Sequence, residues 1–483
     1  MIKIKPYIFP AAALITNLAY GQGTLVASHY PQMYENQQSS MKESEKMVLA
    51  PREQVEININ RMVSDPVLKN AHWGFVIYDP KTKKILNSYN ETQSFVPAST
   101  TKLLTTETAL ALLGPKFRWT TQLEYSGTVD ESGTLNGNLY IVGSGDPSLG
   151  TRKGGAASYT ELVSDFVSAI ATAGIKKVKG NLVIQTAVFK DNKLPVLPAN
   201  IVWMENGSYY LPVGTTQNID PRSEKIIAKQ NNPFQDTKRY FYVSPYNQQM
   251  VYAEQFSGGY VTTKLPDAPS YLATAVRTSL IKRGVPVSGT VVTKMVDPEP
   301  EKRVFLTNYK SPQLRDIVYA TNQPSDNALA EALLRMVGFQ KEGDQGLESG
   351  RMVVTEHLRS VNFDMTGLNY MDGSGLSKSN LVTPLAQVKF LAGIMNSPYY
   401  KDFHDSLPIA GQTGTLKKMF FGNSYGQIFA KTGTLNRVKT LAGYVKTRSG
   451  RTLTFSLLVN NYSGSIDQVK QRMEELLDPV VDF

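Results

Sequence analysis

Alternating apolar and polar residues near both ends of the chain predict strands. Residues 73–78 and 85–89 are rich in aromatic and β-branched side chains, and the turn between them begins at Asp79 and Pro80. Three segments near the C-terminus alternate in the same way: residues 427–435, 440–446 and 451–460. We therefore expect a hairpin near the start of the folded region and three antiparallel strands near its end.

Apolar residues at helical spacing predict helices beside these strands. A helix is expected soon after Pro97, and its apolar stripe consists of Leu103, Leu104, Ala109, Leu110 and Leu113. Another helix follows Pro324, with Ser325 or Asp326 as its N-cap. Residues 53–63 fit a short helix moderately well. An amphipathic helix closes the chain, with Ile466, Val469, Met473, Leu476 and Leu477 on its apolar face.

The middle of the chain differs from both ends. Residues 118–302 contain short strand patterns and many Gly and Asn residues, without a long helical stripe. Because similar elements flank this block on both sides, we interpret it as an inserted domain.

The first residues predict export. Residues 1–23 combine a basic start, an apolar stretch and small residues, which is typical of a signal peptide, and the cut is expected near Gly21 or Ala27. The alternative is a retained membrane anchor, although the apolar stretch is short for spanning a bilayer. Residues 28–50 are expected to form a flexible lead-in, because they include a stretch of Ser, Gln and Glu with few apolar groups.

Composition narrows the classes of function. The chain has 483 residues, enough for about two to four domains. It has no Cys, which excludes disulfides and thiol catalysis, and its four His residues lack metal-ligand spacing, so we predict no metal or cofactor. The net charge of +10 suits an anionic partner such as cell-wall polymer or a membrane surface, or serves solubility alone. Without a basic block or a recognisable binding motif, nucleic acid is not an expected partner.

Ser99 and Lys102 are the first residues that predict chemistry. They lie three positions apart at the start of the predicted helix, where residues i and i+3 share a face and can form a hydrogen bond. A serine needs a neighbouring base to become a nucleophile, and a buried lysine with a lowered pKa can supply one. Alone, this pair is equally consistent with a capped helix and a surface lysine.

Two further motifs change that picture. Ser325-Asp326-Asn327 alone reads as a helix cap, and Lys431-Thr432-Gly433-Thr434 alone reads as the end of a strand. Together with Ser99-x-x-Lys102, in this order, they form the motif set of penicillin-binding proteins and class A β-lactamases.

The motif set assigns a role to each residue. Lys102 is the predicted general base for Ser99, and Ser325 with Lys431 would bring a proton path and a second cation beside it. Asn327 would hold the substrate amide, and the backbone N–H groups of Ser99 and Thr434 would form the oxyanion hole. Gly433 would let the substrate backbone lie against the strand, so Thr432, Gly433 and Thr434 are predicted to bind substrate.

A competing serine motif fails. Gly422-Asn423-Ser424-Tyr425-Gly426 matches the G-x-S-x-G nucleophile elbow, but that mechanism needs a downstream acid and then a His. The last His of the chain is His404, so the elbow cannot be completed. No H-E-x-x-H motif is present either, which argues against a zinc peptidase.

Over most of residues 53–483 the chain resembles the class C, type-4 penicillin-binding proteins, which are D-alanyl-D-alanine carboxypeptidases and endopeptidases. The similarity lies in the segment 95–106, the Gly143-Ser144-Gly145-Asp146-Pro147 motif, the Asp372-Gly373-Ser374-Gly375-Leu376-Ser377 loop and the segment 430–445. The resemblance implies an α/β (α+β) penicillin-binding, serine β-lactamase-like domain, with a five-stranded antiparallel sheet flanked by helices and a large β-rich insertion that contains a nested domain.

These implications give a domain map. Residues 1–27 are the signal peptide, and 28–50 the lead-in. The penicillin-binding domain comprises 51–117 and 303–483, the inserted domain II comprises 118–190 and 266–302, and the nested domain III comprises 191–265. The long first gap agrees, because Ser325 lies 226 positions after Ser99, whereas Lys431 lies only 106 positions after Ser325.

One departure from the family concerns substrate binding. The family usually has an aspartate in the insertion, thought to meet the free amino group of diaminopimelate, and Gln185 takes that place in this alignment of motifs. A neutral amide binds a cation less well than a carboxylate does. Lys378, after the Asp372 loop, either offers a cation to an anionic group of the stem peptide or is a solvated surface lysine.

Three functions remain under consideration. The first is an exported, periplasmic D,D-carboxypeptidase and endopeptidase that acts on peptidoglycan stem peptides and is acylated by β-lactams. The second is a penicillin-hydrolysing enzyme, which the spacing and the lack of an E-x-x-L-N glutamate disfavour. The third is a cell-wall binding or scaffold protein, which would not need Ser99, Lys102, Ser325, Asn327 and Lys431 together. The oligomeric state is left open.

Overall fold

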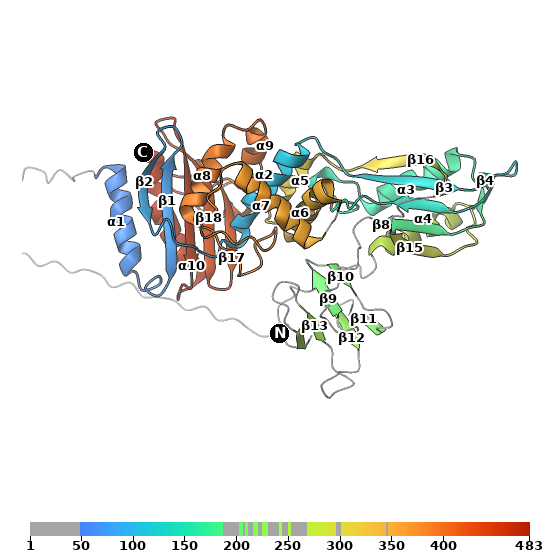
Figure 1. Cartoon of the computed structure of the whole chain (residues 1–483), viewed down its shortest axis with the longest axis horizontal. Coiled ribbons are helices and arrows are strands. Elements are labelled where there is room, and N and C mark those ends of the chain that lie inside the picture. The colour runs from blue at the N-terminus through green and yellow to red at the C-terminus, as the bar shows by residue number, and fades with distance from the viewer. Residues whose placement is uncertain are drawn as a thin grey trace, which may run out of the picture. The chain divides into compact units, whose positions relative to one another are not determined.

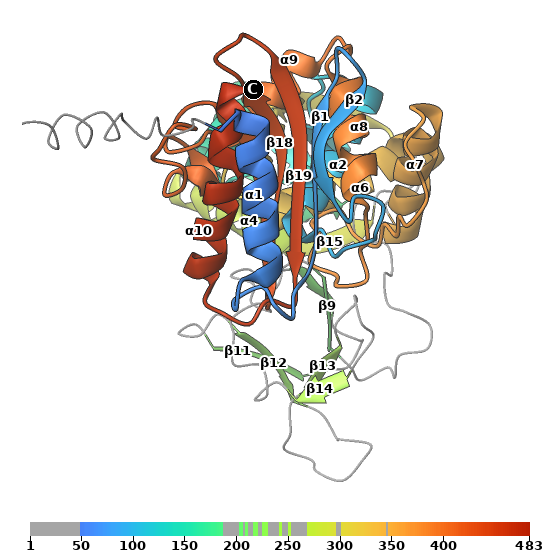
Figure 2. The ribbon, with the colours of Figure 1, turned by 90° about the vertical axis from the view of Figure 1, so that its left-hand side faces the viewer.

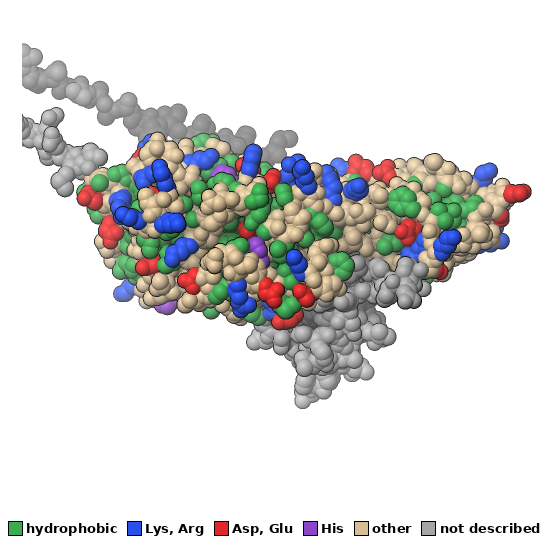
Figure 3. Space-filling view, turned by 45° about the horizontal axis from the view of Figure 1, so that its top comes forward, with side chains coloured by type: hydrophobic (Ala, Val, Ile, Leu, Met, Phe, Trp, Pro, Cys, Tyr) green, Lys and Arg blue, Asp and Glu red, His purple; other side chains and the backbone are tan. Residues whose placement is uncertain are grey.

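The computed structural model describes residues 49–186, 268–295, 301–343 and 346–483, together with six short strands between residues 202 and 252. The predicted signal peptide and nearly all of the lead-in lie outside the described residues. In the described part, every helix is too short or too polar to cross a bilayer. Over the face shown in Figure 3, Lys and Arg side chains are spread among Asp, Glu and neutral residues and do not gather in one patch.

A five-stranded antiparallel sheet brings the two ends of the folded region together (Figure 1). Its order is β17 (Ile428–Leu435), β18 (Val438–Lys446), β19 (Thr452–Asn460), β1 (His72–Asp79) and β2 (Lys84–Tyr89). The predicted hairpin and the three C-terminal strands thus join in one sheet, through the pairing of β1 with β19. The predicted fold class is confirmed.

Two helices cover one face of this sheet (Figure 2). They are α1 (Pro51–Ser64) and α10 (Ile466–Leu477), and the latter is capped by the Ser465 hydroxyl, which accepts a hydrogen bond from the Gln468 N–H. Apolar residues of both helices are buried against Phe75, Phe455 and Leu457 of the sheet. Burial of this stripe, which the sequence predicts for α10, drives the helices onto the sheet.

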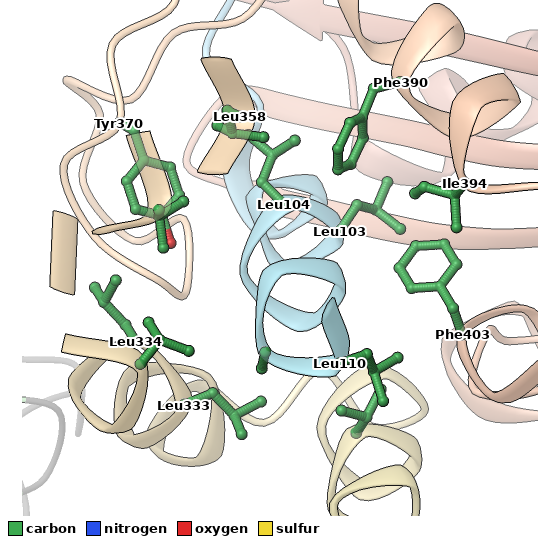
Figure 4. Close-up of a cluster of buried hydrophobic side chains, with 14 of the residues drawn as sticks. Leu103, Leu104, Leu110, Leu333, Leu334, Leu358, Tyr370, Phe390, Ile394 and Phe403 are labelled. Atoms are coloured by element: carbon green, nitrogen blue, oxygen red, sulfur yellow. The ribbon is translucent and has the colours of Figure 1, made fainter. Parts of the chain in front are cut away.

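A cluster of helices, two of which carry predicted motif residues, covers the other face. They are α2 (Lys102–Leu113), α5 (Leu314–Asn322), α6 (Asn327–Glu342), α7 (Leu347–Ser360), α8 (Pro384–Ile394) and α9 (Tyr400–Asp405). Nine of the twelve α2 residues are buried, so this helix is the centre of the cluster. Figure 4 shows Leu103 of α2 directed toward Phe390 and Ile394 of α8. A helix buried on all sides holds its first turn rigidly.

The insertion has its own sheet and core. The sheet order is β15 (Val291–Met295), β8 (Leu182–Thr186), β6 (Leu139–Val142), β3 (Thr120–Ser126) and β16 (Arg303–Lys310). A smaller sheet contains β4 (Thr128–Val129), β5 (Thr134–Asn136) and β7 (Lys177–Val178). Helices α3 (Tyr159–Thr172) and α4 (Ala268–Lys282) pack on each other and supply much of this core.

The insertion extends further than the sequence predicts. The predicted border between residues 302 and 303 assigns β16 to the penicillin-binding domain, but β16 pairs with β3 along its length and completes the sheet of the insertion. The border therefore falls after Lys310, where Ser311 hydrogen bonds back to Trp119. Six strands lie inside the predicted nested range 191–265: β9 (Val202–Glu205), β10 (Ser208–Tyr210), β11 (Thr216–Asp220), β12 (Lys225–Lys229), β13 (Phe241–Val243) and β14 (Met250–Tyr252). The separate nature of that nested domain stays a prediction.

Truncation of Leu457 tests the packing between the sheet and its two outer helices. Leu457 lies on a central strand and has no exposed surface. Leu457→Ala is expected to lower the free energy of unfolding by about 2–5 kcal/mol, because it removes buried methyl groups and leaves a cavity. Ile85→Ala, on the edge strand β2 with 39% of its surface exposed, is the matched control. An equal loss in both variants, measured by urea unfolding, would contradict this account.

Candidate active site

Ser99 lies in a short 3₁₀ turn that leads directly into α2. The turn, η1 (Ala98–Thr101), is held by the Thr100 and Thr101 hydroxyls, which donate to the carbonyls of Pro97 and Ala98 at 2.9 and 2.8 Å. Ser99 is partly exposed, whereas Lys102, the first residue of α2, is completely buried. The sequence predicts Ser99 at a helix start, and the structure places it in the turn immediately before the α-helix.

Lys102 joins three distant segments of the chain. Within the described residues, its Nζ donates to the Ser99 Oγ at 3.1 Å, to the Asn327 Oδ1 at 2.7 Å and to the Ser374 carbonyl at 2.7 Å. Burial lowers the pKa of Lys102 to about 8, although the carboxylates of Glu331, Asp372 and Asp326 act in the opposite direction. An amine with this pKa is neutral in a useful fraction of molecules near neutral pH, as a general base must be.

The loop that carries Ser374 is built around a buried carboxylate. Asp372 accepts hydrogen bonds from the Gly375 and Ser377 N–H groups, both at 2.7 Å. Gly375 has a φ of +80°, and a Cβ on it would lie 1.9 Å from the Ala98 carbonyl oxygen. Only a glycine therefore lets this loop lie against the nucleophile turn.

Glu331 is a site residue that sequence analysis missed. It is only 2% exposed, and its Oε1 accepts a hydrogen bond from the Ser374 N–H at 2.8 Å. Glu331 lies four positions after Asn327 on α6, so both side chains project from the same face toward Lys102. The sequence did contain a signal for Glu331. Glutamate is rarely buried, and this one lies on the same helix face as Asn327, a predicted site residue.

The Ser325-Asp326-Asn327 motif has an unusual backbone. Ser325 has a φ of +64°, a strained conformation for a residue other than glycine, and Asp326 caps α6 by accepting from the Leu329 N–H at 3.0 Å. Asp326 also pairs with Lys153 of the insertion. Within the described residues, the Ser325 hydroxyl makes no hydrogen bond to Lys102 or Lys431. Its role as a proton relay stays a prediction.

Lys431 is completely buried on β17, and its Nζ donates to the carbonyl of Thr432 at 2.9 Å. Burial and the neighbouring Lys102 and Lys439 hold the pKa of Lys431 well below its usual value. Burial is the largest cause of the lowered pKa of Lys102. The role of Lys431 as a second cation beside Lys102 stays a prediction.

Gly433 lies where β17 comes close to the nucleophile turn. A Cβ at this position would lie 2.1 Å from the Thr440 Oγ1 and 2.9 Å from the Ser99 nitrogen. The absence of a side chain thus lets β17 approach the nucleophile turn, and the role of Gly433 in substrate binding stays a prediction.

The outer edge of β17 faces the site. The Ala430 N–H points outward, because it donates to the Pro408 carbonyl across the edge and not to β18. Backbone groups alternate in direction along a strand, so the N–H groups of Thr432 and Thr434 point to the same edge. Thr434 is exposed, and the Thr432 hydroxyl donates to the Thr415 hydroxyl at 2.7 Å. A substrate carbonyl placed at this edge would meet the Thr434 N–H beside Ser99.

The sequence profile of the D-Ala-D-Ala carboxypeptidase 3 (S13) family matches residues 55–220 and 251–479. The chain belongs to the S13 family. The D-alanyl-D-alanine carboxypeptidase of Actinomadura sp. (strain R39) is 27% identical over 451 residues, which cover 84% of this chain and 81% of that protein. The D-alanyl-D-alanine carboxypeptidase DacB of Haemophilus influenzae is 27% identical over 470 residues, which cover 88% and 92% of the two chains.

A solved structure agrees with this family. The crystal structure of penicillin-binding protein 4 from Haemophilus influenzae matches with a TM-score of 0.66 and 23% identity, over 88% of this chain and all of that one. At this level of identity the match shows a shared fold. The predicted family and the predicted class of serine hydrolase are confirmed, and the S13 chain is a serine peptidase.

In this S13 chain Gln185 is buried and hydrogen bonded within the insertion. This side chain is 1% exposed in the sheet of the insertion, and its Oε1 accepts a hydrogen bond from Arg303 at 2.6 Å. Arg303 also pairs with Glu124 and lies over the ring of Tyr140. The Arg303 side chain reaches Gln185 across the two strands that separate β16 from β8, and the predicted substrate contact of Gln185 stays a prediction.

Two other charged side chains lie in segments that the sequence comparison of motifs singled out, Lys378 after the Asp372 loop and Asp146 in the insertion. Lys378 is exposed, as a residue that meets substrate or solvent must be, and its role stays a prediction. Asp146 belongs to the Gly143–Pro147 motif. Its Oδ1 accepts two hydrogen bonds from Ser148, whereas its buried Oδ2 has no partner among the described residues. Burial raises the pKa of Asp146.

The pH dependence of this S13 peptidase tests the state of Lys102. Because only the neutral amine accepts the Ser99 proton, kcat/KM is expected to rise with pH through about 8 and to level off above it. A D-alanyl ester with an uncharged leaving group is the proper substrate, since charged substrates bring other titrations. Lys446→Met, on the far end of β18, is expected to keep the same profile. A rise centred near the ordinary lysine pKa would contradict the role of burial.

Proposed function

We propose that this S13 peptidase cleaves the terminal D-Ala-D-Ala bond of peptidoglycan stem peptides through an acyl-enzyme on Ser99. The observation that carries the proposal is the 3.1 Å hydrogen bond between the Lys102 Nζ and the Ser99 Oγ, made by a fully buried lysine with a pKa of about 8. At pH 7 about one molecule in ten then holds Lys102 neutral, against about one in three thousand at the ordinary lysine pKa.

The reaction follows from the positions of these groups. Lys102 accepts the Ser99 proton while the Oγ attacks the carbonyl of the first D-Ala, and the N–H groups of Ser99 and Thr434 donate to the developing oxyanion. Each such donor contributes about 3 kcal/mol to transition-state stabilisation. The proton then passes to the leaving amine, and the C–N bond breaks. Water attacks the ester by the reverse route, with Lys102 again as base.

We also propose endopeptidase action on D-alanyl-diaminopimelate cross-links. Carboxypeptidase and endopeptidase reactions share the D-alanyl acyl group and differ only in the amine that leaves, so the same acyl-enzyme serves both. The N-terminal basic and apolar segment supports export to the periplasm, where the enzyme would meet peptidoglycan. The net charge of +10 supports association with anionic cell-wall polymer or a membrane surface.

Two alternative functions are less well supported. A β-lactamase needs a base for rapid deacylation, and the class A E-x-x-L-N glutamate is absent from the sequence. A cell-wall scaffold needs no buried base hydrogen bonded to a serine, which is costly for stability. The Haemophilus influenzae relative has been crystallised with a bound β-lactam, which supports β-lactams as covalent inhibitors of this chain too.

Ser99→Ala is the direct test of the proposal. The variant is expected to release no D-Ala from a muropeptide that ends in D-Ala-D-Ala, because no ester can form, while its thermal stability stays close to that of the wild type. Ser424→Ala, in the failed nucleophile elbow, is a second serine variant and is expected to retain hydrolysis. Undiminished D-Ala release by Ser99→Ala would refute the mechanism.

The lifetime of the penicilloyl-enzyme is a separate prediction. Without a dedicated deacylation base, the penicilloyl-enzyme is expected to last much longer than one turnover of the peptide substrate. Labelled protein therefore keeps the added mass after excess benzylpenicillin is removed. Intact-protein mass spectrometry during the chase measures the decay. Rapid return of the unmodified mass would instead point to a β-lactamase.

A further inference from the structure

Lys439 is a buried lysine beside the site that none of the motifs includes. It lies on β18 directly opposite Thr434 of β17, and its residue surface is only 5% exposed. Its Nζ donates to the Thr434 Oγ1 at 2.9 Å. On the other side, Lys439 pairs with Val459 of β19, so its stem runs along the apolar face of the sheet that packs on α1 and α10.

No carboxylate balances this cation within the described residues. The charged group that faces Lys439 is Lys470 of α10, which itself pairs with Asp467. Burial and Lys470 lower the pKa of Lys439 to about 8, so it is largely protonated at neutral pH. A buried cation without a counter-ion is expensive, and an anion that arrives with a ligand would remove that cost.

The hydrogen bond between Lys439 and Thr434 has a fixed direction. A lysine ammonium only donates, so the Thr434 oxygen must accept, and the hydroxyl hydrogen must point elsewhere. Thr434 is exposed at the open edge of β17, where the same residue offers its N–H to the oxyanion. Its hydroxyl hydrogen is therefore available to an acceptor outside the sheet.

We propose that Lys439 is a specificity-determining residue that selects leaving groups with a free α-carboxylate, acting through the Thr434 hydroxyl and through its own charge. The inference rests on the proposed function, because the C-terminal D-Ala is the group that carries this carboxylate. Lys439 is a positioning residue for the carboxylate, whereas the reacting atoms belong to Ser99 and Lys102.

Benzylpenicillin and its methyl ester separate this role from general catalysis. Both acylate serine through the same lactam, but only the acid carries a carboxylate. The ratio of their second-order acylation rates, acid over ester, is expected to fall about 10-fold to 100-fold in Lys439→Met, the range of a charge-assisted hydrogen bond. Lys439→Arg is expected to restore much of the ratio, and Lys446→Met, an exposed lysine on the same strand, to leave it unchanged.

The pH dependence of the ratio gives a readout that a merely structural role would not move. In the wild type the ratio is expected to fall above pH 8, as Lys439 of the free enzyme loses its proton, and in Lys439→Met it is expected to be flat. If Lys439→Met does not fold, Thr434→Val decides, since it keeps the N–H and removes the hydroxyl. An unchanged ratio in whichever variant folds overturns the inference, whereas failure of both compounds to acylate the wild type overturns the proposed function instead.

Discussion

The burial of Lys102 is the constraint on which the rest of the site depends. A lysine in the core is tolerated only if its donors are satisfied, and here each of its three donors meets an oxygen from a different part of the chain: Ser99, Asn327 and Ser374. None of these three oxygens belongs to a carboxylate. The amine is thus satisfied by dipoles without being locked into a direct ion pair, and this keeps it able to give up its proton.

The same constraint explains the close packing around the nucleophile turn. Three segments have to meet within hydrogen-bond distance of one amine, so the backbones must approach more closely than side chains normally allow. Gly375 approaches Ala98 and Gly433 approaches Ser99, at separations that exclude a Cβ at either glycine. The helical cluster around α2 then holds the first turn of that helix in place, because nearly all of its surface is buried.

Local pattern was enough to predict the main sheet, because each strand alternates and each turn contains its own turn residues. It was not enough to predict partners. From the sequence, β16 was assigned to the main domain. Its pairing with β3 joins residues far apart in the chain, and no local sequence pattern predicts such a pairing. The surroundings of Gln185 could not be predicted for the same reason, since its hydrogen bond comes from Arg303, more than a hundred positions away.

Some residues of the candidate site could be predicted from the sequence and others could not. Ser99, Lys102 and Asn327 were predictable because a motif fixes their identity and spacing, and the structure brings them together. Glu331 and Lys439 were not predicted, because their roles depend on contacts that only the fold creates. Glu331 accepts a hydrogen bond from a loop N–H, and Lys439 donates one to the neighbouring strand. Sequence shows a charged residue, but only the fold shows that its charge is buried.

Among the described residues, three buried lysines without a direct carboxylate partner lie along this site, and their surroundings change their pKa values differently. Lys102 keeps distant carboxylates that raise its pKa, so its proton is not lost outright. Lys431 has only cations beside it and is driven furthest toward the neutral form. Lys439 faces a cation too but reaches the open edge through Thr434, where a substrate carboxylate can restore the balance. Arrival of an anionic substrate would then favour the charged form of Lys439 more than that of Lys102, and so bind the carboxylate without disabling the base.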